Sequence, residues 1–399
     1  LAPSGTADRD GCYSGSGIVK DGKLYLMYTS VLGSRQTQSL AVSSDGVHFE
    51  KLGEVIKSDQ LPKNCARSDF RDPKVFKRGD MYYAVMASLS TQEEGQILLY
   101  RSPDLFKWEY VGTLRRDTLT TRGIYECPDL FSLGGKDILL ASPQGYETQD
   151  WRYENLHSSI YMVGELDTGK GSFHIDDEDE IDGGMDFYAP QTLQAPDGRT
   201  VMIAWMQMWS RTTPTAQHGW VGSMILPREL TLKDGKLYQA PVREIERYRW
   251  GEVKADRVPL SGEAALPDVK GTCVELCFTL ELGTAERAGI KVFSDGMHDA
   301  RIYYDRASDK VVFDRSRMGI DITCDVKERD ASIRSVRVDH GNGRISMRIF
   351  LDVSSCEVFL NGGERTMTGN VYSEGSGIVF FAEGGEAVLL DLKKYDIVV

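Results

Sequence analysis

The 399-residue sequence has no run of 18 or more apolar residues, so it offers no candidate transmembrane helix. It also has no excess of positive charge, because 47 Lys and Arg stand against 60 Asp and Glu, a formal net charge of -13. Nucleic-acid binding depends on clustered Lys and Arg side chains. We therefore expect neither a nucleic acid nor a membrane as a partner, and the composition leaves the oligomeric state open.

The sequence is also poor in metal and disulfide signatures. Its seven cysteines are odd in number and scattered, which is typical of reduced thiols and favours a cytoplasmic location. The absence of a signal peptide would normally support the same location, but the chain begins at Leu1 without a Met, so this inference is weak. Cys273 and Cys277 have no second Cys or His pair nearby, so buried thiols are favoured over a metal site. The six His are scattered, and we expect no metal and no cofactor.

Short β-like runs recur through the first part of the chain. Four of them are rich in aromatic and branched residues and begin at residues 23, 81, 137 and 200, at a nearly constant spacing. A second run precedes each one, at 13–19, 71–76, 126–131 and 186–193, and a third follows, at 39–44, 96–101, 158–164 and 221–226. A strand-rich unit of constant length predicts a β-propeller over residues 1–245, with a repeat-free β-sandwich as the alternative.

The character of the sequence changes after the repeat. Residues 244–258 are charged and carry few strand signals, so we interpret them as a linker or a short helix. Alternating strand patterns then appear at 273–280, 289–293, 300–305, 310–314, 335–339, 344–351 and 356–360. Glycine-rich turns at 341–343 and 361–363 accompany them. This pattern predicts a β-sandwich domain over residues 259–399. The fold class is therefore all-β.

Two repeat units open with a carboxylate ahead of an apolar strand. Arg71-Asp72-Pro73 begins one unit and Glu126-Cys127-Pro128 begins the next. Strands that open propeller blades line a common centre, so Asp72 and Glu126 are predicted to converge. Two converging carboxylates are the minimum for cleavage of a glycosidic bond. Taken alone, Asp72 also fits an Asx-turn at a strand entry, and Glu126 a surface carboxylate.

Aromatic side chains in the fourth unit are candidates for stacking on a sugar. Tyr188 and Trp209 offer an apolar face with a polar edge, and so does Trp220. Packing between blades is the alternative for all three, and it is the favoured one for Trp220. Asp186 could bind a sugar hydroxyl or cap a turn.

The ordered set of motifs resembles glycoside hydrolase family 32 over nearly the whole chain. The motifs are Asp10-Gly11-Cys12-Tyr13-Ser14-Gly15-Ser16, Phe70-Arg71-Asp72-Pro73, Glu126-Cys127-Pro128, Asp186-Phe187-Tyr188-Ala189-Pro190-Gln191, Gly219-Trp220-Val221-Gly222, Leu226-Pro227-Arg228-Glu229-Leu230, Asp314-Arg315-Ser316-Arg317 and Ser355-Cys356-Glu357-Val358-Phe359. The family comprises invertases, sucrose-6-phosphate hydrolases and fructan hydrolases. The resemblance implies a five-bladed propeller followed by a β-sandwich.

The resemblance also implies roles for individual residues. Asp72 would stabilise the transition state through the fructosyl hydroxyls, Glu126 would be the general acid/base, and Arg71 would orient the sugar or tune Glu126. Contacts to a small sugar substrate are further expected from Tyr13, Ser14, Asp186, Tyr188 and Trp209.

One departure concerns the nucleophile. The family's nucleophilic Asp lies in an Asn-Asp-Pro-Asn-Gly motif on the first blade, and no such motif occurs here. We therefore expect a fragment with about four of five blades that is inactive or nearly so by itself. Fructosyl transfer and a non-catalytic carbohydrate-binding propeller are the alternatives to hydrolysis.

Overall fold

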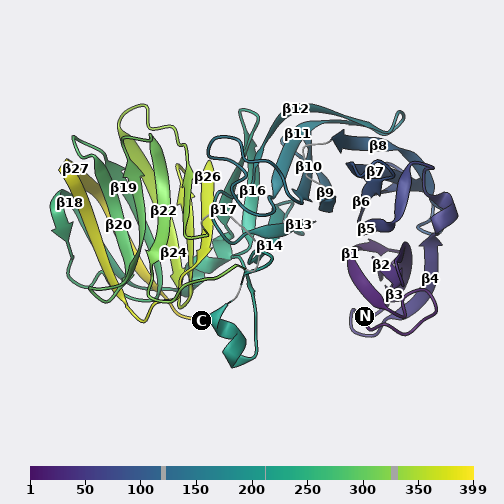
Figure 1. The fold of residues 1–399 in the computed structure, drawn as a ribbon, viewed down its shortest axis with the longest axis horizontal. Helices are drawn as coiled ribbons and strands as arrows, with labels where there is room; N and C mark the ends of the chain where they lie inside the picture. Colours follow the sequence, from purple (N-terminus) through teal and green to yellow (C-terminus); the bar gives the residue numbers. More distant parts are fainter. Residues whose placement is uncertain (118–122, 212, 325–330) are drawn as a thin grey trace. The chain divides into compact units, whose positions relative to one another are not determined.

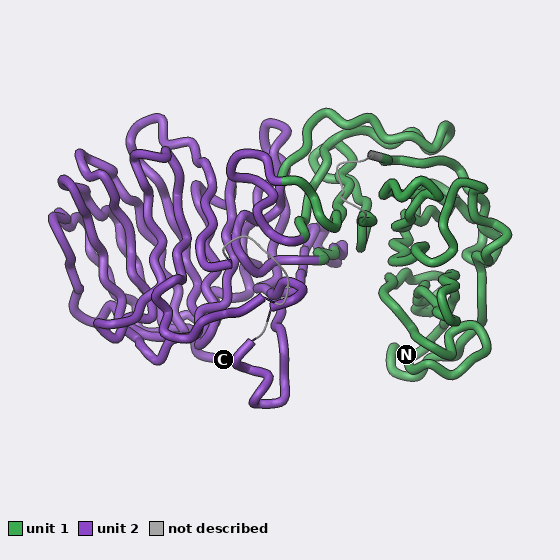
Figure 2. Tube along the Cα trace, in the orientation of Figure 1, with its two compact units in different colours: residues 1–147, 157–179, 189–191 green, residues 148–156, 180–188, 192–399 purple. Residues whose placement is uncertain are grey.

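The computed structural model describes residues 1–117, 123–211, 213–324 and 331–399, and within them β-strands dominate. The chain forms two compact units (Figure 2). The first holds residues 1–147, 157–179 and 189–191, and the second holds residues 148–156, 180–188 and 192–399. The described helices are short 3₁₀ turns at Ser58–Gln60, Pro214–His218 and Arg243–Tyr248. None of them meets the length and hydropathy that a membrane span needs.

The first unit is built from three four-stranded antiparallel sheets, each with its strands in chain order (Figure 1). They are β1–β4 (Gly11–Lys20, Lys23–Leu32, Arg35–Ser43, Glu50–Ile56), β5–β8 (Cys65–Arg78, Met81–Ser90, Gly95–Ser102, Glu109–Asp117) and β9–β12 (Tyr125–Leu133, Lys136–Pro143, Ile160–Asp167, Ser172–Glu180). The opening strands are neighbours, since β1 contacts β5 and β5 contacts β9. These sheets are blades of a β-propeller, so the predicted repeat is confirmed.

A fourth blade of the same kind lies mostly in the second unit, with residues 189–191 of its opening strand in the first. Its strands pair in the order β13 (Tyr188–Gln194), β14 (Thr200–Met206), β16 (Arg228–Lys233) and β17 (Lys236–Pro241). The prediction of a third strand at 221–226 was wrong. That segment contributes only the two-residue β15 (Ser223–Met224), because Gly222 has a φ of 78° and Pro227 has no N–H to donate.

The expectation of a linker or a short helix over 244–258 holds for its first residues, which form a short 3₁₀ helix, and is corrected for the rest. After the 3₁₀ turn at Arg243–Tyr248, the chain enters a 16-residue strand, β18 (Arg249–Ala264), which pairs with β27 (Gly377–Ile397). Much of β18 is exposed, so its charges face water, which explains the weak strand signal in the sequence. This strand begins before the expected domain start at residue 259.

The C-terminal domain is a β-sandwich formed by one ten-stranded sheet that folds back on itself. Its order is β23-β22-β21-β20-β27-β19-β24-β25-β26, with β18 paired to β27. The remaining bounds are β19 Cys273–Glu281, β20 Arg287–Ser294, β21 Asp299–Asp305, β22 Lys310–Arg317, β23 Ile333–Val336, β24 Arg344–Asp352, β25 Ser355–Leu360 and β26 Arg365–Asn370.

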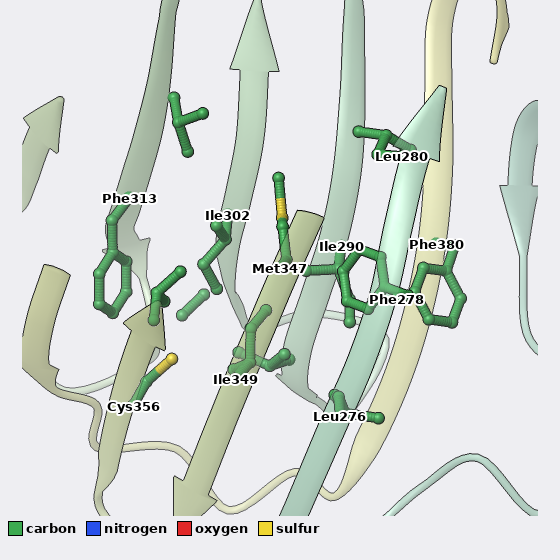
Figure 3. Packing of buried hydrophobic residues seen from close by; sticks show 14 of the residues in the cluster. Leu276, Phe278, Leu280, Ile290, Ile302, Phe313, Met347, Ile349, Cys356 and Phe380 are labelled. Atoms are coloured by element: carbon green, nitrogen blue, oxygen red, sulfur yellow. The ribbon is translucent and has the colours of Figure 1, made fainter. Parts of the chain in front are cut away.

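Strand β27 joins the two halves of this sheet. Its first part pairs with β20 and its second part with β19. Between the parts lie Gly384 and Gly385, with φ values of 67° and 155° that favour glycine. The strand can therefore bend and serve both layers. Apolar side chains fill the space between the layers, with Phe278, Ile290 and Phe380 among those in Figure 3.

A buried arginine ties the fourth blade to the sandwich within the second unit. Arg228 of β16 is fully buried, and its Nη1 donates to Asp182 Oδ2 at 2.9 Å. Its Nη2 donates to Glu357 Oε2 of β25 at 2.7 Å and to Thr368 Oγ1 of β26 at 2.6 Å. Buried charges need such partners, because an unpaired one would lose its hydration without compensation.

Candidate functional site

Arg71, Asp72 and Glu126 come together in the first unit, on neighbouring opening strands β5 and β9. Arg71 Nη2 donates to Glu126 Oε1 at 2.9 Å, and Nη1 donates to Asp69 Oδ1 at 2.8 Å. Arg71 Nε lies 4.0 Å from Asp72 Oδ2. One guanidinium therefore lies between the two predicted carboxylates and holds Glu126 by a direct ion pair.

The two motifs pair position by position across the blades. Arg71 bonds Glu126, Asp72 Oδ2 accepts from the Cys127 N–H at 3.0 Å, and Lys74 Nζ donates to Asp129 Oδ2 at 2.9 Å. Each pair joins equivalent positions in the sequences Arg-Asp-Pro-Lys and Glu-Cys-Pro-Asp. The carboxylates Asp72 and Glu126 are therefore offset by one position in the repeat, and the motifs complement each other instead of duplicating one function.

Both motifs bend at a β-bulge. The register of β5 shifts between Arg71 and Lys74, and that of β9 shifts between Glu126 and Asp129 opposite Leu140 and Ser142. Asp72 and Cys127 have φ values of 60° and 48°, in the left-handed region that non-glycine residues rarely adopt. Each also precedes a proline, which restricts its backbone further. Local strain of this kind persists only where the surroundings hold it, and it concentrates at functional sites.

Burial controls the charge of Asp72. Asp72 is only 7% exposed, and its removal from water raises the pKa of its carboxyl group to about 6. The Cys127 N–H and the Arg71 charge oppose the rise, while the Glu126 charge adds to it. Asp72 can therefore change its protonation state near pH 6.

Two neighbours of Asp72, Arg71 and Cys127, each keep one charge state. For Arg71, burial acts to lower the pKa, but the Glu126 and Asp69 carboxylates outweigh it and the pKa is raised. The thiol of Cys127 has its pKa raised well above the usual value, chiefly by burial. It is therefore a neutral neighbour of the two carboxylates, and Arg71 is the cation between them.

The other residues predicted in the first unit lie on β1. Tyr13 is 50% exposed and Ser14 is exposed, at a point where the register of β1 shifts between Tyr13 and Gly15. Ser16, two residues further along, donates to the Pro73 carbonyl and accepts from the Val75 N–H, each at 2.8 Å. The Ser-Gly-Ser motif thus connects β1 to the strand that carries Asp72. Whether Tyr13 and Ser14 contact a sugar stays a prediction.

The predicted residues of the fourth blade lie in the second unit and differ in their surroundings. Asp186 is fully buried: it accepts from Arg211 Nη1 at 2.7 Å, from the Asn370 N–H at 2.8 Å, and from Arg315. Tyr188 is 2% exposed. Trp209 is 51% exposed and packs edge-to-face on Trp205 with ring centroids 5.4 Å apart. The Trp209 ring is exposed and the Tyr188 ring is not, and whether Asp186, Tyr188 or Trp209 contacts a sugar stays a prediction.

Two contributors to the site were not predicted from the sequence. Gln191 donates from Nε2 to the Cys127 carbonyl at 2.9 Å, and the Cys127 N–H holds Asp72. Gln191 follows Ala189-Pro190, and Ala189 also has a positive φ of 54°. The recurrence of a residue-proline pair at the opening of the second, third and fourth blades was therefore the available signal. Among the described residues, no group of three His, Cys, Asp or Glu is arranged to hold a metal ion.

Paired carboxylates are what the cleavage of a glycosidic bond requires, and here they lie on neighbouring opening strands of a propeller, which is the arrangement expected of a glycoside hydrolase. The sequence model of the glycosyl hydrolases family 32 N-terminal domain matches residues 1–241, and that of the C-terminal domain matches residues 244–396. The chain belongs to glycosyl hydrolase family 32. The predicted resemblance is therefore confirmed.

Relatives in this family are similar over nearly the whole chain. A sucrose-6-phosphate hydrolase of Zymomonas mobilis is 35% identical, with 99% of this chain and 80% of that protein covered. One of Bacillus subtilis is 36% identical, with 93% and 76% covered. Among solved structures, the sucrose-6-phosphate hydrolase of Lactobacillus gasseri has a TM-score of 0.87 at 26% identity, covering 100% of this chain and 80% of that one.

A second solved relative carries a ligand. A mutant of the Bombyx mori GH32 β-fructofuranosidase, solved in complex with sucrose, has a TM-score of 0.81 at 33% identity. The similarity covers 97% of this chain and 79% of that one.

Proposed function

We propose that this protein hydrolyses the β-fructofuranosidic bond of sucrose, sucrose-6-phosphate or a fructan. The observation that carries the proposal is the Arg71 guanidinium between Asp72 and Glu126, with all three side chains largely buried. Relatives at about this similarity are named as sucrose-6-phosphate hydrolases and a β-fructofuranosidase, which supports the same substrate class.

In the proposed reaction Glu126 is the general acid/base. It protonates the leaving oxygen as the glycosidic bond breaks and later takes a proton from the water that releases the fructosyl group. Arg71 fixes the orientation of the Glu126 carboxylate through the 2.9 Å ion pair.

Asp72 stabilises the transition state. Positive charge develops on the sugar ring as the bond breaks, and a carboxylate with restricted hydration interacts with it more strongly than one in water. Its pKa of about 6 means that the charged form dominates above that pH. The proposal therefore predicts that turnover falls as the pH decreases through 6.

A retaining mechanism also needs a nucleophile about 5 Å from the acid/base carboxyl. This sequence has no Asn-Asp-Pro-Asn-Gly motif, and we assign no residue of this chain to that role. We propose that the chain by itself turns over sucrose slowly or not at all.

The test compares the hydrolysis of sucrose and of sucrose-6-phosphate by this chain and by a version joined to the upstream segment of a family relative. We expect activity in the joined version and little in the chain alone. Full activity in the chain alone would contradict the assignment of the nucleophile elsewhere. Activity in neither would favour a non-catalytic carbohydrate-binding propeller, and fructose oligomers formed at high sucrose would indicate transfer.

A further inference from the structure

A row of buried polar side chains runs through the first blade beside the Asp72 strand. Gln36 and Gln38 are two residues apart on β3, so their side chains lie on one face of the sheet. Thr29 of β2 lies directly opposite Gln38 in the register of the two strands. Gln36 is 7% exposed, and Gln38 and Thr29 are fully buried. Amides and hydroxyls are buried at this depth only with hydrogen-bond partners.

Their partners lie on the neighbouring blade, around the Arg71-Asp72 dipeptide. Gln36 Oε1 accepts from the Phe70 N–H at 3.0 Å, and Gln38 Nε2 donates to the Phe70 carbonyl at 2.8 Å. Thr29 Oγ1 accepts from the Asp72 N–H at 3.0 Å. Peptide groups on both sides of Arg71 are thus bonded to side chains of the first blade.

Thr29 and Gln38 form one chain of bonds with a fixed direction, and Gln36 joins it only through the backbone of Phe70. Thr29 Oγ1 donates its single hydrogen to Gln38 Oε1 at 3.0 Å, so its remaining capacity is to accept from Asp72. Gln38 then has its amide nitrogen directed at the Phe70 carbonyl. Replacement of Thr29 or Gln38 would remove a bond from a buried group of the other, and replacement of Gln36 would remove the acceptor of the Phe70 N–H.

The backbone at Asp72 needs this support. Strand β5 is the edge strand of its sheet, and its ladder to β6 is interrupted on both sides of Phe70 and Arg71. Asp72 also has its unfavourable φ of 60° ahead of Pro73. Hydrogen bonds from the first blade therefore hold the backbone of residues 70–72 where the ladder to β6 is interrupted.

We propose that Thr29, together with Gln38 and Gln36, is a positioning residue that fixes the Asp72 bulge and thereby aims the Asp72 carboxylate at the Cys127 N–H. The inference rests on the proposed function for its catalytic meaning, but the positioning itself can be measured without turnover. The groups that face Asp72 are Arg71, Glu126 and Cys127, and none of them belongs to the first blade.

The central experiment replaces Thr29 with Val, which keeps the shape and removes the hydroxyl. The readout is the titration of Asp72 by ¹³C NMR of the chain labelled at Asp carboxyl carbons, with the signal assigned through Asp72→Asn. Loss of the Asp72 N–H acceptor should let the bulge relax and weaken the bond from the Cys127 N–H. Because that bond lowers the pKa of Asp72, we expect the protonation equilibrium to shift toward the acid by about threefold or more.

Two variants control this result. Thr29→Ser retains the hydroxyl and should keep the Asp72 titration of the unaltered chain. Ser30→Ala removes a buried hydroxyl pair with Ser39 on the same two strands, at 2.6 Å, without touching β5 in any described bond. It should lower stability and leave the titration unchanged, which separates positioning from a general loss of packing.

An unchanged Asp72 titration in folded Thr29→Val would overturn the proposal. If that variant fails to fold, Thr29→Ala is the second test, because the smaller side chain leaves room for a water. Failure of both to fold beside a folded Ser30→Ala would assign Thr29 to the fold and would also overturn the proposal. A shifted titration, combined with unaltered turnover of Asp72→Asn in the joined version, would uphold the positioning and reject the proposed function instead.

Discussion

Asp72 and Asp186 are both buried aspartates in the opening segments of propeller blades, yet burial affects them in opposite ways. Asp72 is raised in pKa to about 6, with one backbone N–H on its Oδ2 and the Arg71 Nε 4.0 Å away. Asp186 is lowered in pKa, because Arg315 and Arg211 together outweigh the desolvation that acts to raise it. The number of direct cation contacts, and not burial alone, therefore decides whether a buried carboxylate can exchange a proton.

The two residues therefore suit different tasks. A carboxylate whose charge is only partly compensated retains a field that can act on a substrate. The charge of a carboxylate held by two arginines is compensated inside the fold, so it acts on a substrate only weakly. The predictions below test this division, beginning with the largest expected effect.

Glu126→Gln tests the site itself. In a version of the protein that turns over sucrose, the change should lower kcat by roughly 10²–10⁴-fold, because Gln cannot exchange a proton with the leaving group. Steady-state assays measure this effect. The control is Glu109→Gln, which removes an exposed carboxylate paired with Arg101 and should leave kcat as it is. Equal kcat in Glu126→Gln would place the acid/base elsewhere.

Asp186→Asn tests the structural carboxylate. The change leaves Arg211 and Arg315 buried with one negative charge fewer, so we expect a loss of about 3–5 kcal/mol in the free energy of unfolding. Urea unfolding at neutral pH measures it. Asp352→Asn, at an exposed position of the same unit, should change stability far less. A loss below about 1 kcal/mol would mean that the arginines find other partners.

The pH dependence of stability should differ in sign between the two aspartates. Asp72 binds its proton more tightly when folded, so its ionisation opposes folding as the pH rises from about 4 to about 6. Asp72→Asn should therefore gain stability over the unaltered chain across that window, by at most about 3 kcal/mol. The contribution of Asp186 has the opposite form: it is present above the unfolded pKa and is lost as the pH falls through the lower folded pKa.

Urea midpoints of Asp72→Asn and Asp186→Asn, measured between pH 4 and 8, give this comparison directly. Curves that run parallel would show that the two carboxylates do not differ as described.

Arg71→Met gives the smallest expected effect. It removes the cation near Asp72, so the pKa of Asp72 should rise further, on the order of one unit. The ¹³C NMR titration of Asp72 measures the change. The matched control is Arg78→Met, which removes an arginine of the same strand that pairs with Asp137 and should leave the Asp72 titration in place. A downward shift in Arg71→Met would contradict the assignment of Arg71 as a lowering influence.

Much of the fold could be predicted because the strands carry local signals. The strands that begin at residues 23, 81 and 200 start where the aromatic and branched runs start. Strand β18 could not be predicted, because its many exposed charged residues give no alternating strand pattern. It forms a strand through its pairing with β27. Pairing over such a distance leaves no trace in the composition of either strand.

In the candidate site, too, local motifs could be predicted and contacts between distant parts of the chain could not. The Arg-Asp-Pro and Glu-Cys-Pro motifs predicted that Asp72 and Glu126 converge, and the Arg71 contacts bring them together. The burial of Asp186 was not predictable, because Arg315 lies 129 residues away along the chain. The buried amides of Gln36 and Gln38 were missed as well, since polar residues in an antiparallel strand ordinarily face water.

The bent strand β27 has a consequence for the order of events during synthesis. Strands β18, β19 and β20 each pair with it, so none of them has all its partners until β27 has been synthesised. At roughly 5–20 residues per second, many seconds pass between the end of β19 at Glu281 and the start of β27 at Gly377. Over that interval the sandwich strands expose unpaired edges, while the first blades already have all their partners. The C-terminal domain can therefore complete its sheet only after nearly the whole chain has been synthesised.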